Sequence, residues 1–259
     1  MDVADRQKPK PGELFVDHIS HFVADLDAAA RAFEALGMKV TPTSVQVTAE
    51  GPLGASNRCV MLDEGYLELL SPTHDTPSAE RLRKLMARYT GVHLVCFGTP
   101  DAEAEHRRLE AHGFAPQLSE FERKVEGGMA RFKVVRVAPE AMPEGRIQYV
   151  QQLAPEHVWL RGFVNPPRLD EVFVVATDPI EAAARWSRFT AMIPAREGDV
   201  VRLRATRGSV VIGDRRAIAG ILGEAPPAPG VAGYSLKGSK AAGAVMLASA
   251  LGGVLLRKS

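Results

Sequence analysis

Hydrophobic and polar residues repeat one arrangement three times along the chain. Each copy has an apolar, β-rich run, then an aspartate, then apolar residues at helical spacing. The runs cover residues 15–24, 91–100 and 171–177, and the aspartates are Asp25, Asp101 and Asp178. The first two aspartates are 76 residues apart and the next two 77. Self-similarity at a fixed period indicates that the chain is built from similar structural units.

Each copy predicts a strand followed by a helix. A short run rich in β-branched residues is typical of a strand, and an aspartate at the start of a helix can cap free backbone N–H groups. In the first copy, Ala29, Phe33 and Leu36 recur at helical spacing and predict one buried face. Gly37 and Gly113 follow, where the end of a helix favours a left-handed residue.

Further strand-like runs follow the first two helices, at 39–47, 58–62 and 66–70, and at 130–137 and 146–153. Each unit is therefore read as βαβββ, although one strand of the second unit has no clear signal. A fourth, weaker unit would have its first strand at 230–237, a helix at 240–251 and a last strand at 253–257. Few residues remain for the third and fourth units together, so both must be shorter than the first two.

Proline-rich segments at 154–170 and 223–230 mark breaks between units. We therefore expect two domains, residues 13–160 with the first two units and residues 168–259 with the trimmed pair.

Composition and charge exclude several classes of protein. The 259 residues are 46% hydrophobic and 24% charged, which is typical of a folded protein with a sizeable core. Because 32 Lys and Arg residues balance 31 Asp and Glu residues without a basic stripe, nucleic acid is not an expected partner. The polar N-terminus lacks the apolar stretch of a secretory signal, and the apolar run 241–256 is shorter than the roughly 20 residues that span a bilayer. We expect a cytoplasmic protein with no membrane partner and with Cys59 and Cys96 as buried free thiols.

Short motifs of the first unit resemble the vicinal oxygen chelate superfamily, which includes glyoxalase I, methylmalonyl-CoA epimerase and extradiol dioxygenases. The motifs are Asp17-His18-Ile19, the Ala-Asp-Leu-Asp at 24–27 and the Gly-Tyr-Leu-Glu-Leu-Leu at 65–70. Residues 152–159 resemble the segment that follows the first pair of units in larger glyoxalase-like members. The resemblance implies an α+β fold in which paired βαβββ units form curled mixed sheets around a cup, with a degenerate second pair at the C-terminus.

Metal ligands of this superfamily come from the first and last strands of each unit. The resemblance therefore implies as ligands His18, Glu68, His93 and Gln148, with Gln151 and Gln152 as alternatives to Gln148 in another register. His18 and His93 lie 75 residues apart, within one residue of the repeat. Imidazole and carboxylate ligands suit several divalent ions, so Zn, Ni, Co, Mn and Fe(II) all stay open.

Two further features bear on this site. The adjacent leucines 69 and 70 argue against a simple alternation that would expose Glu68, and a buried carboxylate needs a partner. His21 lies three residues after His18, so on a strand it is expected to face the other way and serve structure.

The resemblance implies a metal-dependent lyase or isomerase acting on a small oxygenated metabolite through a metal-stabilised enolate. Glu68 or a metal-bound water would be the base. Two histidines and one carboxylate also match the ligand set of non-haem Fe(II) oxygenases, which makes an extradiol-type dioxygenase the second reading. A metal-free small-molecule binding or resistance protein is the third.

Substrate contacts are predicted less directly. Asn57 and Arg58 end the glycine-rich segment 49–58 between two strands, where they could orient an anionic or carbonyl group. The expected partner is a small-molecule substrate, and a homodimer is left open.

Overall fold

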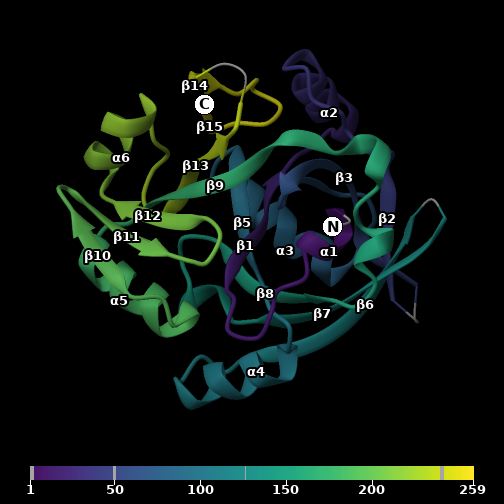
Figure 1. Ribbon diagram of the computed structural model, residues 1–259, viewed down its shortest axis with the longest axis horizontal. Coiled ribbons are helices and arrows are strands. Elements are labelled where there is room, and N and C mark those ends of the chain that lie inside the picture. Colours follow the sequence, from purple (N-terminus) through teal and green to yellow (C-terminus); the bar gives the residue numbers. More distant parts are fainter. Residues whose placement is uncertain (1–2, 49–50, 126, 240–241) are drawn as a thin grey trace.

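The computed structural model describes residues 3–48, 51–125, 127–239 and 242–259 (Figure 1). A short helix, α1 (Val3–Arg6), precedes the first unit, which consists of β1 (Phe15–Phe22), α2 (Leu26–Ala35), β2 (Ser44–Thr48), β3 (Gly51–Glu64) and β4 (Tyr66–Pro72). Helix α3 (Pro77–Met86) leads to the second unit: β5 (Gly91–Gly98), α4 (Ala102–Ala111), β6 (Gln117–Val125), β7 (Gly128–Arg136) and β8 (Arg146–Gln152).

The C-terminal part begins with β9 (Asn165–Val175), α5 (Pro179–Thr190), β10 (Pro194–Glu197), β11 (Val200–Arg204) and β12 (Ser209–Gly213). These five elements repeat the βαβββ order. Then follow α6 (Arg215–Leu222), β13 (Gly230–Lys237), β14 (Gly243–Met246) and β15 (Val254–Lys258). Figure 1 shows α5, α6 and β10–β12 on one side of the molecule and β2, β3, β6 and β7 on the other.

The three repeated aspartates cap helices as predicted. Side-chain oxygens of Asp25, Asp101 and Asp178 accept hydrogen bonds from backbone N–H groups in the first turns of α2, α4 and α5. Gly37 and Gly113 follow α2 and α4 with φ angles of 81° and 79°, the left-handed conformation that the pattern required. The predicted start and end of each helix therefore rest on local chemistry that the sequence displays.

Replacing Asp178 by alanine is expected to lower the free energy of unfolding by about 1 kcal/mol, because the side chain satisfies the N–H groups of Ile180 and Glu181. Urea unfolding would measure the change. Asp199→Ala is the control: that exposed carboxylate has a weak ion pair 3.8 Å from Arg216 and should alter stability far less. Equal losses in the two variants would contradict a capping role.

Strands of the first two units form a closed circuit around a cup. Going round it, hydrogen-bonded neighbours follow the order β1, β4, β3, β2, β6, β7, β8 and β5, and β5 pairs back with β1. Strand β6, which supplies the strand without a clear sequence signal, pairs with β2 and β7. Strand β13 extends the sheet from β5, and β9, β12, β11 and β10 continue it. The predicted α+β fold of βαβββ units with curled mixed sheets around a cup is confirmed.

The fourth unit departs from the prediction. The structure has no helix within the described part of 240–251; residues 240 and 241 lie outside the described residues. Instead β14 pairs antiparallel with β15, joining Val245 to Leu255. Helix propensity is a weak preference that tertiary pairing overrides. No helix in the described parts of the chain is long and apolar enough to cross a membrane.

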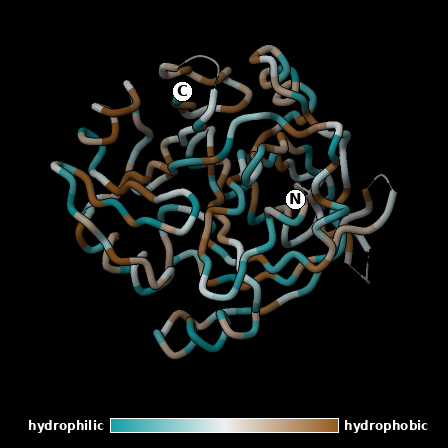
Figure 2. The backbone as a smooth tube through the Cα atoms, viewed as in Figure 1, coloured by the Kyte–Doolittle hydropathy of each residue, from teal (hydrophilic) through white to brown (hydrophobic). Residues whose placement is uncertain are grey.

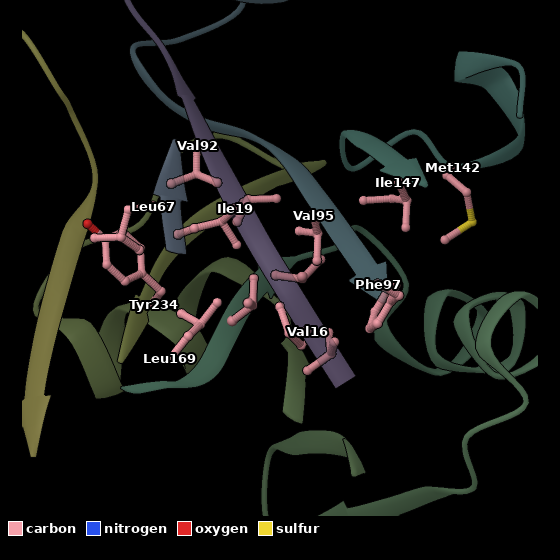
Figure 3. Close-up of a cluster of buried hydrophobic side chains, with 14 of the residues drawn as sticks. Val16, Ile19, Leu67, Val92, Val95, Phe97, Met142, Ile147, Leu169 and Tyr234 are labelled. Atoms are coloured by element: carbon pink, nitrogen blue, oxygen red, sulfur yellow. The ribbon is translucent and has the colours of Figure 1, made fainter. Parts of the chain in front are cut away.

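The largest core lies on the outer side of the cup wall, where first strands meet the C-terminal part. Figure 3 shows Val16 and Ile19 of β1 beside Val95 of β5, with Leu169 and Tyr234 contributed by β9 and β13. In Figure 2 hydrophobic backbone segments gather in the central strands, while α4 at the lower edge is largely hydrophilic. Strands β1, β4 and β5 are thus buried on both faces, and one face of each turns toward the cup.

Candidate active site

A cavity of about 30 Å³ lies inside the cup, bounded by strands of the first two units. Its polar lining residues are His18, Gln46, Tyr66, Glu68, Arg136, Arg146 and Gln148. Its apolar lining residues are Leu70, Leu94, Phe121, Phe132, Val134 and Val150. The cavity therefore combines an apolar wall with a concentration of charged side chains, as small-molecule sites commonly do.

Glu68 enters this cavity from β4 because the strand alternates. Tyr66, Glu68 and Leu70 line the cup, while Leu67 and Leu69 point into the large core. The prediction that adjacent leucines break the alternation was wrong: both faces of β4 are buried, so both can carry leucine. Gly65, with φ of 76°, forms the tight turn between β3 and β4 and sets Glu68 opposite Cys59.

The Glu68 carboxylate has polar partners although the residue is only 5% exposed. Asn57 Nδ2 donates a hydrogen bond of 2.6 Å to Oε1, and the Ser20 hydroxyl donates to Oε2. These two neighbours hold the carboxylate in one orientation, and neither is acidic or basic. Glu68 is thus held in one position facing the cavity.

His18 is part of a chain of polar groups. Its Nδ1 lies 2.6 Å from Asp17 Oδ1, and Gln152 Nε2 donates to Asp17 Oδ2 at 2.7 Å. The imidazole also stacks on Tyr66 with ring centroids 4.3 Å apart. Burial works against the charged imidazole, but Cys96 and the Asp17 carboxylate outweigh it and raise the pKa of His18. The ring is therefore tuned toward the protonated form.

Gln148 also lines the cavity, whereas its two register alternatives do not. The Arg136 Nε donates to Gln148 Oε1 at 3.1 Å, and Gln148 Nε2 lies 3.6 Å from Cys96 Sγ. Gln151 instead contacts the start of α4, and Gln152 binds Asp17. Both thiols, Cys59 and Cys96, are free and buried as predicted.

Two arginines complete the polar lining. Arg136 on β7 and Arg146 on β8 are half-buried because they line the cavity. Burial lowers the pKa of Arg146 to about 10, with the Glu68 charge opposing and Arg81 adding to the effect. Burial and then the charge of Arg146 lower the pKa of Arg136. The cup thus carries two guanidinium groups close enough to repel each other.

His93 does not join the other predicted ligands. Register in the sheet shows why: His18 on β1 pairs with Tyr66, and the equivalent pair in the second unit is Leu94 with Arg146. A separation of 76 residues leads from His18 to Leu94, so His93 is one position out of phase. On a strand, one position means the opposite face.

The surroundings of His93 confirm this displacement. Ser20 pairs with Leu94 and His21 with Val92, which leaves His93 at an irregularity in the β1–β5 ladder. Its Nε2 donates to the Tyr89 carbonyl at 2.8 Å, and its ring stacks on Tyr89 and Phe22. The imidazole is thus held by a carbonyl and two aromatic rings rather than facing the cavity.

Of the two predicted substrate contacts, the structure places one beside the cavity lining and one elsewhere. Residues 51–58 belong to β3 rather than to a loop; residues 49 and 50 lie outside the described residues. Asn57 reaches Glu68, whereas the Arg58 guanidinium binds the Thr41 carbonyl and Asp27. Consecutive strand residues face opposite sides, so the pair could not share the site.

The donors gathered in the cup do not fit the metal site that the sequence implied. They are one imidazole, one carboxylate and one amide: the Gln148 oxygen already accepts from Arg136, and the imidazole is tuned toward its protonated form. Two guanidinium groups in the same cavity would repel a divalent cation. In the part of the chain that the structure describes, no three His, Cys, Asp or Glu side chains form a group suited to a metal ion.

Sequence reasoning missed Asp17, Tyr66, Arg136 and Arg146 as members of the site. The signal for the arginines was present: Arg146, Gln148 and Val150 alternate along one strand, and so do Phe132, Val134 and Arg136. A charged residue in phase with residues facing the cup must face it too. Asp17 sits at an irregularity in the β1–β5 ladder, which alternation alone does not reveal.

Comparisons with known proteins agree with this architecture. The model of a family described as glyoxalase-like domain matches residues 16–190. A hypothetical protein from Staphylococcus aureus superposes with a TM-score of 0.75 at 16% identity, covering 95% of this chain and 99% of that chain. No curated protein matches the sequence.

Two enzymes from Streptomyces coelicolor are also similar. A mutant of 4-hydroxymandelate synthase has a TM-score of 0.55 at 19% identity, covering 87% of this chain and 71% of that chain. A variant of methylmalonyl-CoA epimerase has a TM-score of 0.43 at 26% identity, covering 55% of this chain and 100% of that chain.

Proposed function

We propose, from the premise that this chain belongs to the glyoxalase-like domain family, that it is a lyase or isomerase. It would move a proton on a small oxygenated metabolite bound in the cup of the first two units. The family match over residues 16–190 supports the resemblance to the vicinal oxygen chelate superfamily, and the 4-hydroxymandelate synthase structure shares the fold. That superfamily hosts several chemistries, so the activity must be argued from the site.

Glu68 is the observation that carries the proposal. It is a buried carboxylate, oriented by Asn57 and Ser20, that lines a cavity together with His18 and two arginines. A base that acts on carbon needs a fixed position against the substrate and a nearby positive charge to stabilise the anion that forms. This cup offers both within a few neighbouring strands.

The proposed step begins with a substrate that has a hydrogen on the carbon next to a carbonyl group. The Glu68 carboxylate accepts that proton, the C–H electron pair forms a carbon–carbon double bond, and the carbonyl π electrons move to oxygen as an enolate. An isomerase would return the proton to another position, and a lyase would expel a leaving group. The protonated Glu68 or the His18 imidazolium would be the donor.

Members of the superfamily are typically metal-dependent. From the sequence, Zn, Ni, Co, Mn or Fe(II) was accordingly expected to stabilise the enolate. The donors in the cup argue for another source of positive charge, because Arg136 and Arg146 already face the cavity. Guanidinium groups can stabilise a developing oxyanion by preorganised hydrogen bonds and charge. The Fe(II) dioxygenase is not proposed, because His93 faces away from the other donors.

The test is proton exchange in D₂O. Protein treated with a chelator is incubated with a panel of small 2-oxo and 2-hydroxy acids, and loss of the signal of the hydrogen next to the carbonyl or hydroxyl group is followed by proton NMR. We expect catalysed exchange in at least one compound, unchanged when Zn, Ni, Co, Mn or Fe(II) is added. Exchange that needs an added ion would restore the metal-dependent reading.

A metal-free binding protein is the second candidate, and one observation favours it. Six apolar side chains from five strands line the cavity, which suits an apolar or aromatic ligand portion. In that case compounds would bind and protect the protein against unfolding, yet none would exchange hydrogen with solvent. The same D₂O samples therefore distinguish the two functions.

A further inference from the structure

We propose that Arg146, assisted by Arg136, binds a carboxylate group of the ligand inside the cup. The location inside the cup follows from the residues, whereas the identification of the anion as the substrate's own carboxylate rests on the proposed function. The inference deepens that function by naming a substrate class: small organic acids. It also assigns a task to two residues that the sequence pattern had not singled out.

Arg146 has no polar or charged partner among the described residues. It is half-buried on β8 and lines the cavity, yet its guanidinium forms no hydrogen bond or ion pair with any residue that the structure describes. Arg136 uses its Nε for Gln148 and has no carboxylate partner among the described residues. Partly removing a guanidinium from water without a partner is costly, because its donors and its charge lose part of their hydration.

Four half-buried arginines outside the cup show the usual solution. The Arg58 side chain pairs with Asp27, Arg108 with Glu105, Arg185 with Glu144 and Arg202 with Glu171 and Glu197. In each case an acidic residue offsets the charge. Arg136 and Arg146 have no acidic partner among the described residues, and both line one cavity; Arg257 on β15 also has none, but it does not line this cavity.

Glu68 does not serve as their missing partner. Its two oxygens accept from Asn57 and Ser20, and no ion pair joins it to either arginine in the described structure. Its charge is felt by both guanidinium groups at longer range. One carboxylate cannot balance two cations, so the cup keeps a net positive charge that an incoming anion would neutralise.

The shape of the donor favours a planar anion. A guanidinium presents a rigid fork that binds carboxylate or phosphate through two parallel hydrogen bonds. Carboxylate is the choice here because Glu68 lines the same cavity, and an organic carboxylate, unlike inorganic phosphate, brings a carbon atom beside that base. A carboxylate anchored on Arg146 would hold the neighbouring carbon of an organic acid inside the cavity that Glu68 also faces.

The binding experiment uses the full chain and isothermal titration calorimetry. Malonate is the probe, malonamide is its neutral counterpart, and phosphate is the tetrahedral anion. We expect malonate to bind and malonamide not to bind measurably. Tight phosphate binding without malonate binding would overturn the choice of a carboxylate.

Variants locate the anion. Arg146→Gln is expected to weaken malonate binding by about tenfold or more, since it removes charge-assisted hydrogen bonds. Arg146→Lys, which keeps the charge but loses the fork, should fall between Arg146→Gln and the unchanged protein. Arg58→Gln is the matched control: this half-buried arginine lies outside the cavity, and its loss should leave malonate affinity unchanged.

Thermal unfolding without ligand separates a binding role from a structural one. Arg146→Gln should unfold at the same temperature as the unchanged protein or higher, because an unpartnered charge is removed. A large drop together with unchanged malonate affinity would overturn the proposal. Malonate binding that depends on Arg146, without proton exchange in any acid, would support this inference and contradict the proposed enzyme. Exchange of neutral ketones with no malonate binding would do the reverse.

Discussion

Replacing Glu68 by glutamine is expected to reduce the catalysed proton exchange by about a thousandfold. The amide has almost the same size and shape as the carboxylate but cannot accept a proton at neutral pH. Its oxygen can still accept the hydrogen bond from Asn57, and its NH₂ group can donate to the Ser20 hydroxyl. The fold and the binding of malonate should therefore persist while the chemistry is lost.

The measurement is the exchange rate in D₂O for the acid that the unchanged protein turns over fastest. Glu64→Gln serves as the control, because Glu64 ends the neighbouring strand β3 and does not line the cavity. It should keep the full rate. If Glu68→Gln also kept the full rate, the base would have to be another group of the cup, and His18→Gln would be the next variant to test.

Periodicity explains both the success and the failure of the sequence prediction at this site. Strand alternation correctly placed His18 on the cup face and His21 on the other, where His21 contacts Tyr234 and the Leu251 carbonyl. The same rule, applied strictly to the 76-residue repeat, leads to Leu94 rather than His93. Accepting a slip of one residue in order to match two histidines exchanged the two faces of the strand.

The same reasoning explains why the two arginines of the cup were not predicted. With a histidine expected at the second first-strand position, a metal was the natural source of charge for an enolate, and the arginines of the last strands went unnoticed. In the structure Arg136 and Arg146 face the cup, because β7 and β8 curl inward and direct alternate side chains into it. Curling of a sheet depends on long-range pairing, such as β1 with β5, which no local pattern states.

The fold itself was predictable where local chemistry decides it. Capping aspartates, left-handed glycines and alternating strands predicted most of the first two units and the first strand and helix of the third. The prediction failed in two places where local signals are weak. Strand β6 has a polar, largely exposed sequence, and 240–251 mixes glycine, alanine and serine with few large apolar residues. In the latter, pairing of β14 with β15 decides the outcome.

Acid is expected to destabilise the protein through His21, which joins the first unit to the C-terminal strands. Its Nδ1 lies 3.0 Å from the Leu251 carbonyl and its Nε2 lies 3.2 Å from the Tyr234 hydroxyl. A neutral imidazole fits both contacts, with Nδ1–H donating and Nε2 accepting. Burial lowers the pKa of His21 from 6.5 to about 4; the Leu251 contact opposes this shift, whereas the charge of His93 adds to it.

Above pH 6.5 the imidazole is neutral in both the folded and the unfolded chain, so this stabilising effect is complete. As the pH falls from 6.5 to 4, the unfolded chain binds a proton that the folded chain does not, and the free energy of unfolding decreases. Because each pKa unit is worth about 1.4 kcal/mol, His21 alone should lower it by about 3 kcal/mol. Burial also lowers the pKa of His93 to about 4, which adds to the loss over the same range.

Urea unfolding at pH 7 and pH 4 measures the effect. His21→Gln removes the titrating group, so its stability should change less with pH than that of the unchanged protein, although it is lower at pH 7. His112→Gln, on the exposed end of α4, should follow the unchanged protein at both pH values. If the His21 variant lost as much stability as the unchanged protein between pH 7 and pH 4, acid sensitivity would arise elsewhere. The contact between the first unit and the C-terminal strands would then not be its source.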